Sequence, residues 1–199
     1  MSGRATAALV ALVVLVAPAG CGAPRPTLSP VTRPPATVAT TSTTATTIPV
    51  PELPGASTAE VSVPPGTATQ SLLTGIRASH QAGFDRVVFE FRGRAPGYRI
   101  GYVTRPILED ASGREVQVAG NAVLRVHMEH ASDGDASGHP TYAGAHDLRP
   151  DGTTNVVELV RAGGFEAVLT WVMGLKQQAP FRVQSLAGPP RLVVDVAAP

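Results

Sequence analysis

The sequence has little of several features that would narrow its function at once. Among 199 residues there is a single cysteine, Cys21, so no disulfide can form within the chain. Charged residues make up 16%, below the about 25% of ordinary globular proteins. The net charge is only +1, which gives no electrostatic basis for binding nucleic acid or an anionic membrane surface. Aromatic residues are also scarce, at 5%.

No hydrophobic run is long enough for a transmembrane helix, which needs about 20 apolar residues. The run ALVALVVLVAPA (8–19) follows Arg4 closely, and together they indicate a signal peptide over residues 1–20. Two cleavage sites fit. PAGC (18–21) resembles the bacterial lipobox, in which the cysteine becomes the acylated N-terminus, whereas an A-x-A site at 17–19 would give a secreted protein with a free thiol. The lone cysteine stands at the position that lipidation requires, which favours a lipoprotein anchored through Cys21.

Residues 21–66 change character, being dense in proline, threonine and alanine and free of aromatic side chains. Proline has no amide hydrogen for a helix or a sheet ladder, and the segment offers too little apolar surface to offset the entropy of ordering. We therefore predict a disordered linker between the lipidated cysteine and a folded domain at residues 67–199. Its threonine and proline content indicates either an O-glycosylated stalk or a simple spacer.

Short segments with period-two alternation dominate the folded part. RVVFEF (86–91) places Val87, Phe89 and Phe91 on one face, and GYRIGYV (97–103) does the same with two tyrosines and an isoleucine. Glycine and proline separate most of these segments, and the Gly163–Gly164 pair predicts a hairpin turn. Further strands are expected over residues 122–129, 156–162, 165–175 and 191–196. The pattern predicts an all-β fold, a small β-sandwich or barrel.

Specific motifs then resemble a known family. The segments GFDRVVFEFRGRAPGYRIGYV (83–103) and FRVQSLAGPPRLVVDV (181–196), with Tyr142, Gly144 and FEAVLTWVMGL (165–175) between them, are similar to the AMIN-like domain of actinobacterial lipoproteins. The resemblance covers nearly the whole predicted domain. It implies a β-sandwich of two sheets and a module without known enzymatic activity. It also implies a role at the cell envelope, in contact with peptidoglycan.

Motifs for catalysis or cofactor binding are not found. The sequence has no G-x-S-x-G elbow, H-E-x-x-H, Walker A or G-x-G-x-x-G pattern, so we predict no enzyme, no cofactor and no metal site. His127 and His130 would point to opposite faces of a strand. The loop over residues 129–147 gathers histidines and aspartates, which leaves a metal-dependent enzyme as an alternative, but its composition is that of a polar loop of turn-forming residues.

The candidate ligand-binding residues lie on strand faces. Arg86 and Glu90 share one face of a predicted strand, and Arg191 with Asp195 does so on the last one. These charges are either an exposed set of salt bridges or a surface that binds glycan hydroxyls and peptide carboxylates. Trp171 is expected in the core, whereas the tyrosines belong either to the core or to a platform for sugar rings. The candidates are Arg86, Glu90, Tyr98, Tyr142 and Arg191.

The sequence thus predicts a non-catalytic, lipid-anchored binding module that contacts peptidoglycan or another wall polymer on the outer face of the cell membrane. One alternative is a protein-interaction module that recruits an envelope enzyme or secretion component. A carrier of a small hydrophobic ligand within the sandwich is a further alternative.

Overall fold

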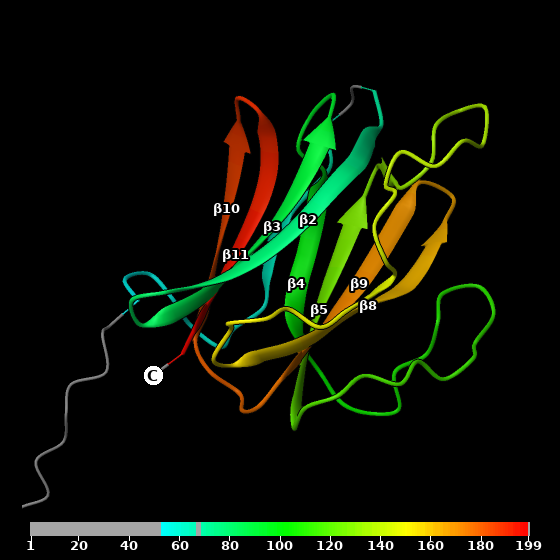
Figure 1. Cartoon of the computed structure of the whole chain (residues 1–199). Coiled ribbons are helices and arrows are strands. Elements are labelled where there is room, and N and C mark those ends of the chain that lie inside the picture. The colour runs from blue at the N-terminus through cyan, green and yellow to red at the C-terminus, as the bar shows by residue number, and fades with distance from the viewer. Residues whose placement is uncertain (1–52, 67–68, 199) are drawn as a thin grey trace, which may run out of the picture. The chain divides into compact units, whose positions relative to one another are not determined.

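The computed structural model describes residues 53–66 and 69–198, and within these ranges every regular element is a β-strand. The strands form two sheets, as predicted (Figure 1). The six-stranded sheet has the order β1 (Val61–Val63), β4 (Gly97–Val103), β5 (Ala122–Glu129), β9 (Val168–Leu175), β8 (Val156–Phe165) and β7 (Asp147–Leu148). The five-stranded sheet has the order β10 (Phe181–Ala187), β11 (Pro190–Ala197), β3 (Phe84–Arg92), β2 (Ser71–Gln81) and β6 (Ala131–Ser132).

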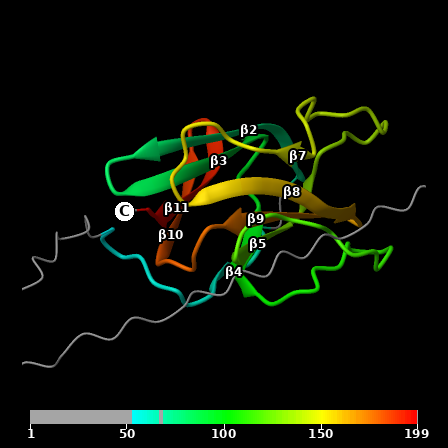
Figure 2. The ribbon, with the colours of Figure 1, turned by 60° about the horizontal axis from the view of Figure 1, so that its bottom comes forward.

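The two sheets pack face to face, one layer above the other (Figure 2). Alternation along the strands decides which side chains enter the space between them. Val87 and Phe89 of β3 and Val194 of β11 are fully buried, and Val87 pairs directly with Val194 in the antiparallel register. The predicted inward faces of residues 86–91 and 191–196 are therefore confirmed.

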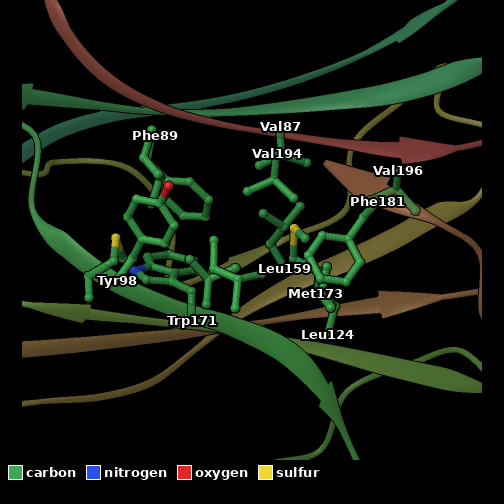
Figure 3. Packing of buried hydrophobic residues seen from close by; sticks show 14 of the residues in the cluster. Val87, Phe89, Tyr98, Leu124, Leu159, Trp171, Met173, Phe181, Val194 and Val196 are labelled. Carbon is green, nitrogen blue, oxygen red and sulfur yellow. The ribbon is translucent and has the colours of Figure 1, made fainter. Parts of the chain in front are cut away.

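The core is built around Trp171, which lies on β9 with none of its surface exposed. Phe89 of the opposite sheet meets its ring edge-on, with 6.4 Å between centroids. Phe181, Met173 and Leu124 fill the other end of the same cluster (Figure 3). Burying large side chains of this kind contributes about 2 kcal/mol each relative to exposure, so this cluster is the main force that holds the sheets together.

A second, smaller core lies on the outer side of the six-stranded sheet. The long connection between β4 and β5 folds across that face and places Ile107 and Val118 against Val123 of β5 and Val172 of β9. The buried Glu158 carboxylate accepts a hydrogen bond from the Ala119 amide at 2.5 Å and fixes the returning end of the connection. We call residues 104–121 the covering loop.

The folded domain begins earlier in the chain than the sequence predicts. Residues 53–66 were assigned to the linker, yet Leu53 is buried, Ser57 bridges to Phe181, and Val61–Val63 forms β1 along β4. Gly97 explains part of this packing, because a Cβ there would overlap the backbone of Pro65. The linker boundary at residue 66 is therefore wrong, since a proline-rich segment can still add an edge strand.

The hairpin between β8 and β9 also differs from the prediction. Gly163 and Gly164 lie inside β8, and the turn falls on Glu166 and Ala167, which adopt positive φ angles of 50° and 62°. Phe165 consequently belongs to β8 and is 60% exposed. The sequence signal failed here because residues other than glycine occupy the left-handed conformation.

The predicted signal peptide, Cys21 and residues 22–52 of the predicted linker lie outside the described residues. Within the described part of the chain, no helix has the length and apolar character to cross a membrane.

Candidate functional site

The outer face of the five-stranded sheet carries the strand residues that point away from the core. Arg86 of β3 and Arg182 of β10 converge on Asp195 of β11, which lies between them and is fully buried. Arg86 donates from Nε and Nη2 to the two carboxylate oxygens at 2.7 and 2.9 Å, and Arg182 donates from Nε at 2.9 Å. Both guanidinium groups also lie over the Phe84 ring, 5.2 and 5.5 Å from its centroid. Burial of the carboxylate makes this a structural cluster.

Glu90 and Arg191 stand directly opposite each other on β3 and β11 of the same face. Glu90 nevertheless bonds to Arg77 of β2 on its other side. Gly75 permits this orientation, because a Cβ there would lie 2.8 Å from Glu90 Oε2. Arg191 instead donates from Nε to the Pro189 carbonyl at 3.3 Å.

The face is cationic relative to the rest of the chain. Two carboxylates, Glu90 and Asp195, stand on it against five arginines, while the whole chain has a net charge of only +1. The hydrogen bonds to Asp195 raise the pKa of Arg86, which keeps its charge fixed. The five arginines are Arg77, Arg86, Arg92, Arg182 and Arg191.

The two candidate tyrosines are not part of this face. Tyr98 and Tyr142 are each only 6% exposed and belong to the core cluster, where burial raises the pKa of both phenols. Tyr142 packs edge-on against Trp171 at 5.8 Å and donates its hydroxyl hydrogen to the Ala145 carbonyl at 3.0 Å. Both rings therefore contribute to the core and offer no exposed surface for stacking. Of the five candidates, the structure brings together Arg86, Glu90 and Arg191.

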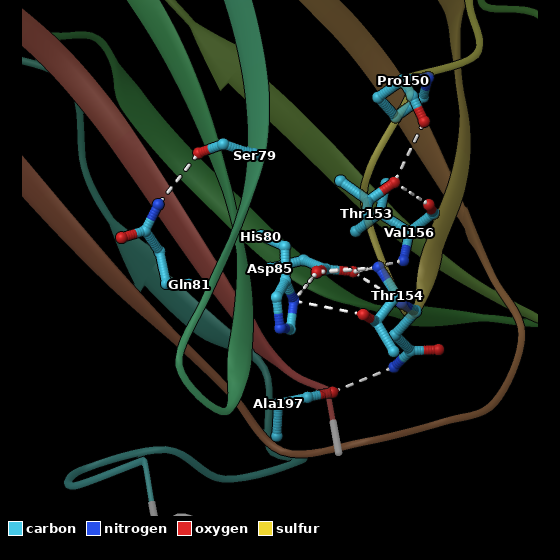
Figure 4. A network of polar contacts seen from close by, with 10 residues as sticks. Ser79, His80, Gln81, Asp85, Pro150, Thr153, Thr154, Val156 and Ala197 are labelled. Atoms are coloured by element: carbon cyan, nitrogen blue, oxygen red, sulfur yellow. Dashed lines mark hydrogen bonds and ion pairs between the residues drawn. The ribbon is translucent and has the colours of Figure 1, made fainter.

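A buried carboxylate that the sequence did not reveal lies near the start of β3. Asp85 is fully buried and accepts hydrogen bonds from the backbone amides of Thr154, Asn155 and Val156 at 2.6–3.0 Å, and it bonds to His80 Nδ1 at 2.8 Å (Figure 4). Burial raises the pKa of Asp85, but the backbone and His80 hydrogen bonds outweigh it and hold the pKa below its usual value. The contact ties one sheet to the other. The motif G-F-D-R was visible in the sequence, but its partner, 69 residues away, was not.

The histidine- and aspartate-rich loop is organised by hydrogen bonds of its own. Asp135 Oδ1 accepts from the Ser137 and His139 amides at 2.9 and 3.0 Å, as expected of a turn-forming aspartate. Asp133 pairs with Arg161 of β8. Over residues 53–66 and 69–198, no group of three or more histidine, cysteine, aspartate or glutamate side chains is arranged to hold a metal ion.

These features define a small β-sandwich domain in which the covering loop packs on part of one outer sheet face and arginines cluster on the other. In a comparison with protein families, residues 71–198 match the AMIN-like domain, and the chain belongs to this family. The AMIN-like domain is a binding-type module rather than a catalytic family and is often associated with peptidoglycan. It is typical of periplasmic or envelope proteins. Searches of curated proteins and of solved structures each returned no match.

Proposed function

We propose that the protein is a non-catalytic cell-envelope module that binds peptidoglycan or another wall polymer through the outer face of its five-stranded sheet. The observation that carries the proposal is the surplus of arginine on this uncovered face, where five guanidinium groups stand against two carboxylates. Membership of the AMIN-like family supports the polymer as the ligand.

The chemistry of the face suits an extended polar chain. Arginine offers five donors in a planar fork that fits carboxylates in two-point geometry and also bonds to hydroxyl groups. The cluster around Asp195 holds Arg86 and Arg182 in place, so these two donors lose little conformational entropy on binding. Arg191 and Arg77 lie further along the same face and extend the row of donors.

The test is co-sedimentation of the full chain with purified peptidoglycan. We expect saturable pelleting that weakens in Arg191→Gln. The matched control is Arg125→Gln, because Arg125 is an exposed arginine on the outer face of β5 in the other sheet. Equal pelleting of an unrelated β-sandwich protein, or no pelleting of the wild type, would contradict the proposal.

We also propose that residues 1–20 direct export and that Cys21 carries the lipid anchor, with a tether over residues 22–52. The supporting observation is the position of the only cysteine, directly after a small-residue segment. Mass spectrometry of the mature N-terminus tests this. Diacylated Cys21 at the first position supports it, whereas a mature chain that begins at Gly20 would identify a secreted protein.

A second candidate function, recruitment of a partner protein, is favoured by the free edge of β2. This strand spans Ser71–Gln81 but pairs with β6 only through Ser71 and Leu72. Beside the remaining edge lies a hollow of about 200 Å³, lined by Ile76 and Leu148 among others. An extended segment of another protein can add to such an edge. A photo-crosslinker at Ser79 tests this, and a protein adduct that disappears in Ala78→Pro would support it.

A further inference from the structure

Three arginines at one end of the uncovered face have no carboxylate partner among the described residues. Arg92 ends β3, Arg94 follows it in the turn to β4, and Arg191 begins the adjacent part of β11. The other arginines of this face are paired: Arg77 with Glu90, and Arg86 and Arg182 with Asp195. Arg86 and Arg182 share the single carboxylate of Asp195, so the excess of positive charge is one there and three at the end with Arg92, Arg94 and Arg191.

The structure shows why Arg191 is left unpaired. Its cross-strand neighbour Glu90 reaches the other way, over Gly75, to bond with Arg77. Only the Nε of Arg191 is occupied, by the Pro189 carbonyl. The terminal nitrogens of its guanidinium group make no hydrogen bond within the described residues and are available to a ligand.

A hollow lies beside these arginines. It has a volume of about 270 Å³ and lies between the β3–β4 turn and the tip of the β10–β11 hairpin, which are neighbours at the top of Figure 1. Its lining combines an arginine, a serine and small or aliphatic residues, of which Leu186 is 38% exposed. The lining residues are Gly93, Arg94, Ala95, Ser185, Leu186, Ala187 and Pro190. We call them, together with Arg191, the Gly93 site.

We propose that the Gly93 site binds the terminal carboxylate of a peptide that ends in a small aliphatic residue. Arg94 donates to the carboxylate from within the hollow, and Arg191 contributes its charge and donors from the adjoining strand. Leu186 and Pro190 contact the aliphatic side chain. The inference rests on the proposed function, because it identifies the part of a wall polymer, the free end of its peptide, that this face recognises.

The mixed lining favours a peptide carboxylate over a phosphate-rich polymer. A phosphate would satisfy the arginines equally well but has no apolar group to place against Leu186 and Pro190. A hollow of about 270 Å³ is close to the lower limit, about 300 Å³, of ordinary small-molecule sites, so it admits one or two small residues. Inorganic phosphate is therefore the discriminating competitor.

The experiment is an NMR titration of the full chain with acetyl-alanyl-alanine, its C-terminal amide and inorganic phosphate. We expect the free acid to shift the amide signals of Gly93, Leu186 and Ala187 in a saturable way. The amide, which lacks the charge, should bind at least about ten-fold more weakly. The double variant Arg94→Gln/Arg191→Gln should lose at least about the same factor, whereas Arg125→Gln should bind like the wild type.

Equal binding of acid and amide, or shifts unaffected by the double variant, would overturn the inference. Binding of phosphate as tight as that of the peptide would also overturn it and would identify an anionic polymer as the ligand. Peptidoglycan pelleting distinguishes failure of the Gly93 site from failure of the proposed function. If the double variant pellets like the wild type, the Gly93 site is not the contact and the loss expected in Arg191→Gln fails with it, but saturable pelleting of the wild type still supports wall binding. If the wild type itself does not pellet, the proposed function fails, whatever the titration shows.

Discussion

The two sheets share one core, but their outer faces differ. On the six-stranded sheet, valines of β5 and β9 point outward and are covered by Ile107 and Val118 of the covering loop. On the five-stranded sheet the outward positions of β2, β3, β10 and β11 carry five arginines beside Val88 and Val193, and the covering loop packs against the other sheet. The outer face of the six-stranded sheet is thus partly covered by a loop of the same chain, while the arginines on the outer face of the five-stranded sheet remain at least partly exposed to solvent. We base the proposed binding surface on this difference and on no sequence motif.

The largest expected effect comes from removing the contact on which both faces depend. Asp85→Asn places an amide group against three backbone N–H donors and leaves part of them unsatisfied in a buried position. We expect the free energy of unfolding to fall by about 3 kcal/mol. Urea denaturation measures it, with Asp151→Asn, at an exposed position, as the control. An effect below that of the control would show that Asp85 does not join the sheets.

The same contact predicts a pH dependence. The pKa of Asp85 in the folded protein lies below its value in the unfolded chain, about 3.9. The contribution of the Asp85 carboxylate to the free energy of unfolding is therefore complete above that value. It is lost as the pH falls through the lower pKa of the folded state. The stability difference between wild type and Asp85→Asn should shrink as the pH falls below about 4. A difference that persists unchanged at low pH would contradict this assignment.

The covered face should be sensitive to one added carbon. A Cβ at Gly174 would overlap the Ala119 carbonyl, so Gly174→Ala should push the covering loop away from the sheet. We expect a loss of about 2 kcal/mol and faster hydrogen exchange at Val116 and Val118. Gly66→Ala is the control, because its added Cβ would make only ordinary contact, 3.9 Å from Arg94. Unchanged exchange in the loop would mean that the face is covered by other means.

Substitutions on the outer face of the five-stranded sheet should reduce the free energy of unfolding less. Asp195→Asn removes the negative charge between Arg86 and Arg182, but both arginines are partly exposed and can rehydrate. We therefore expect a cost of about 1–2 kcal/mol, less than for Asp85. Thermal unfolding measures it. A cost as large as that of Asp85→Asn would place Asp195 among the principal supports of the fold.

The variant with the smallest expected effect on stability tests the charge arrangement of the five-stranded face most directly. Arg77→Gln breaks an exposed ion pair and should alter the free energy of unfolding by no more than about 0.5 kcal/mol. It also frees Glu90 to pair with Arg191 across the strands, which should weaken carboxylate binding at the Gly93 site. The NMR titration with acetyl-alanyl-alanine measures this binding. Unchanged binding would show that Glu90 does not control the availability of Arg191.

Local pattern was sufficient where the chain alternates regularly. Residues 97–103 form a strand with the predicted bounds, and Phe89 and Val194 point inward as expected. Strand β2 was not recognised, because a bulge between Leu73 and Gly75 shifts its register and interrupts the period of two. The covering loop escaped prediction for another reason: its apolar residues have no periodicity, and their partners lie on distant strands.

For the candidate site, the sequence indicated the polar face through Arg86, Glu90 and Arg191 but not how its charges are partnered. Asp195 looked like an exposed partner of Arg191, whereas it is buried under Arg86 and Arg182. Cross-strand neighbours are set by register, and register is a property of two segments that a single-strand pattern does not contain. The hollow at Gly93 likewise depends on two turns that are far apart in the chain.

The bridge between Ser57 and Phe181 fixes where the polypeptide enters the sandwich. Phe181 begins β10, and the Gly93 site lies at the other end of that strand, around Ala187. Six residues of strand place the two about 20 Å apart, at opposite ends of one sheet (Figure 1). A force applied through the N-terminal side is thus delivered beside Phe181 and Arg182, far from Arg94 and Arg191. If the preceding residues tether the domain, as we propose, the Gly93 site lies at the end of this sheet farther from the tether.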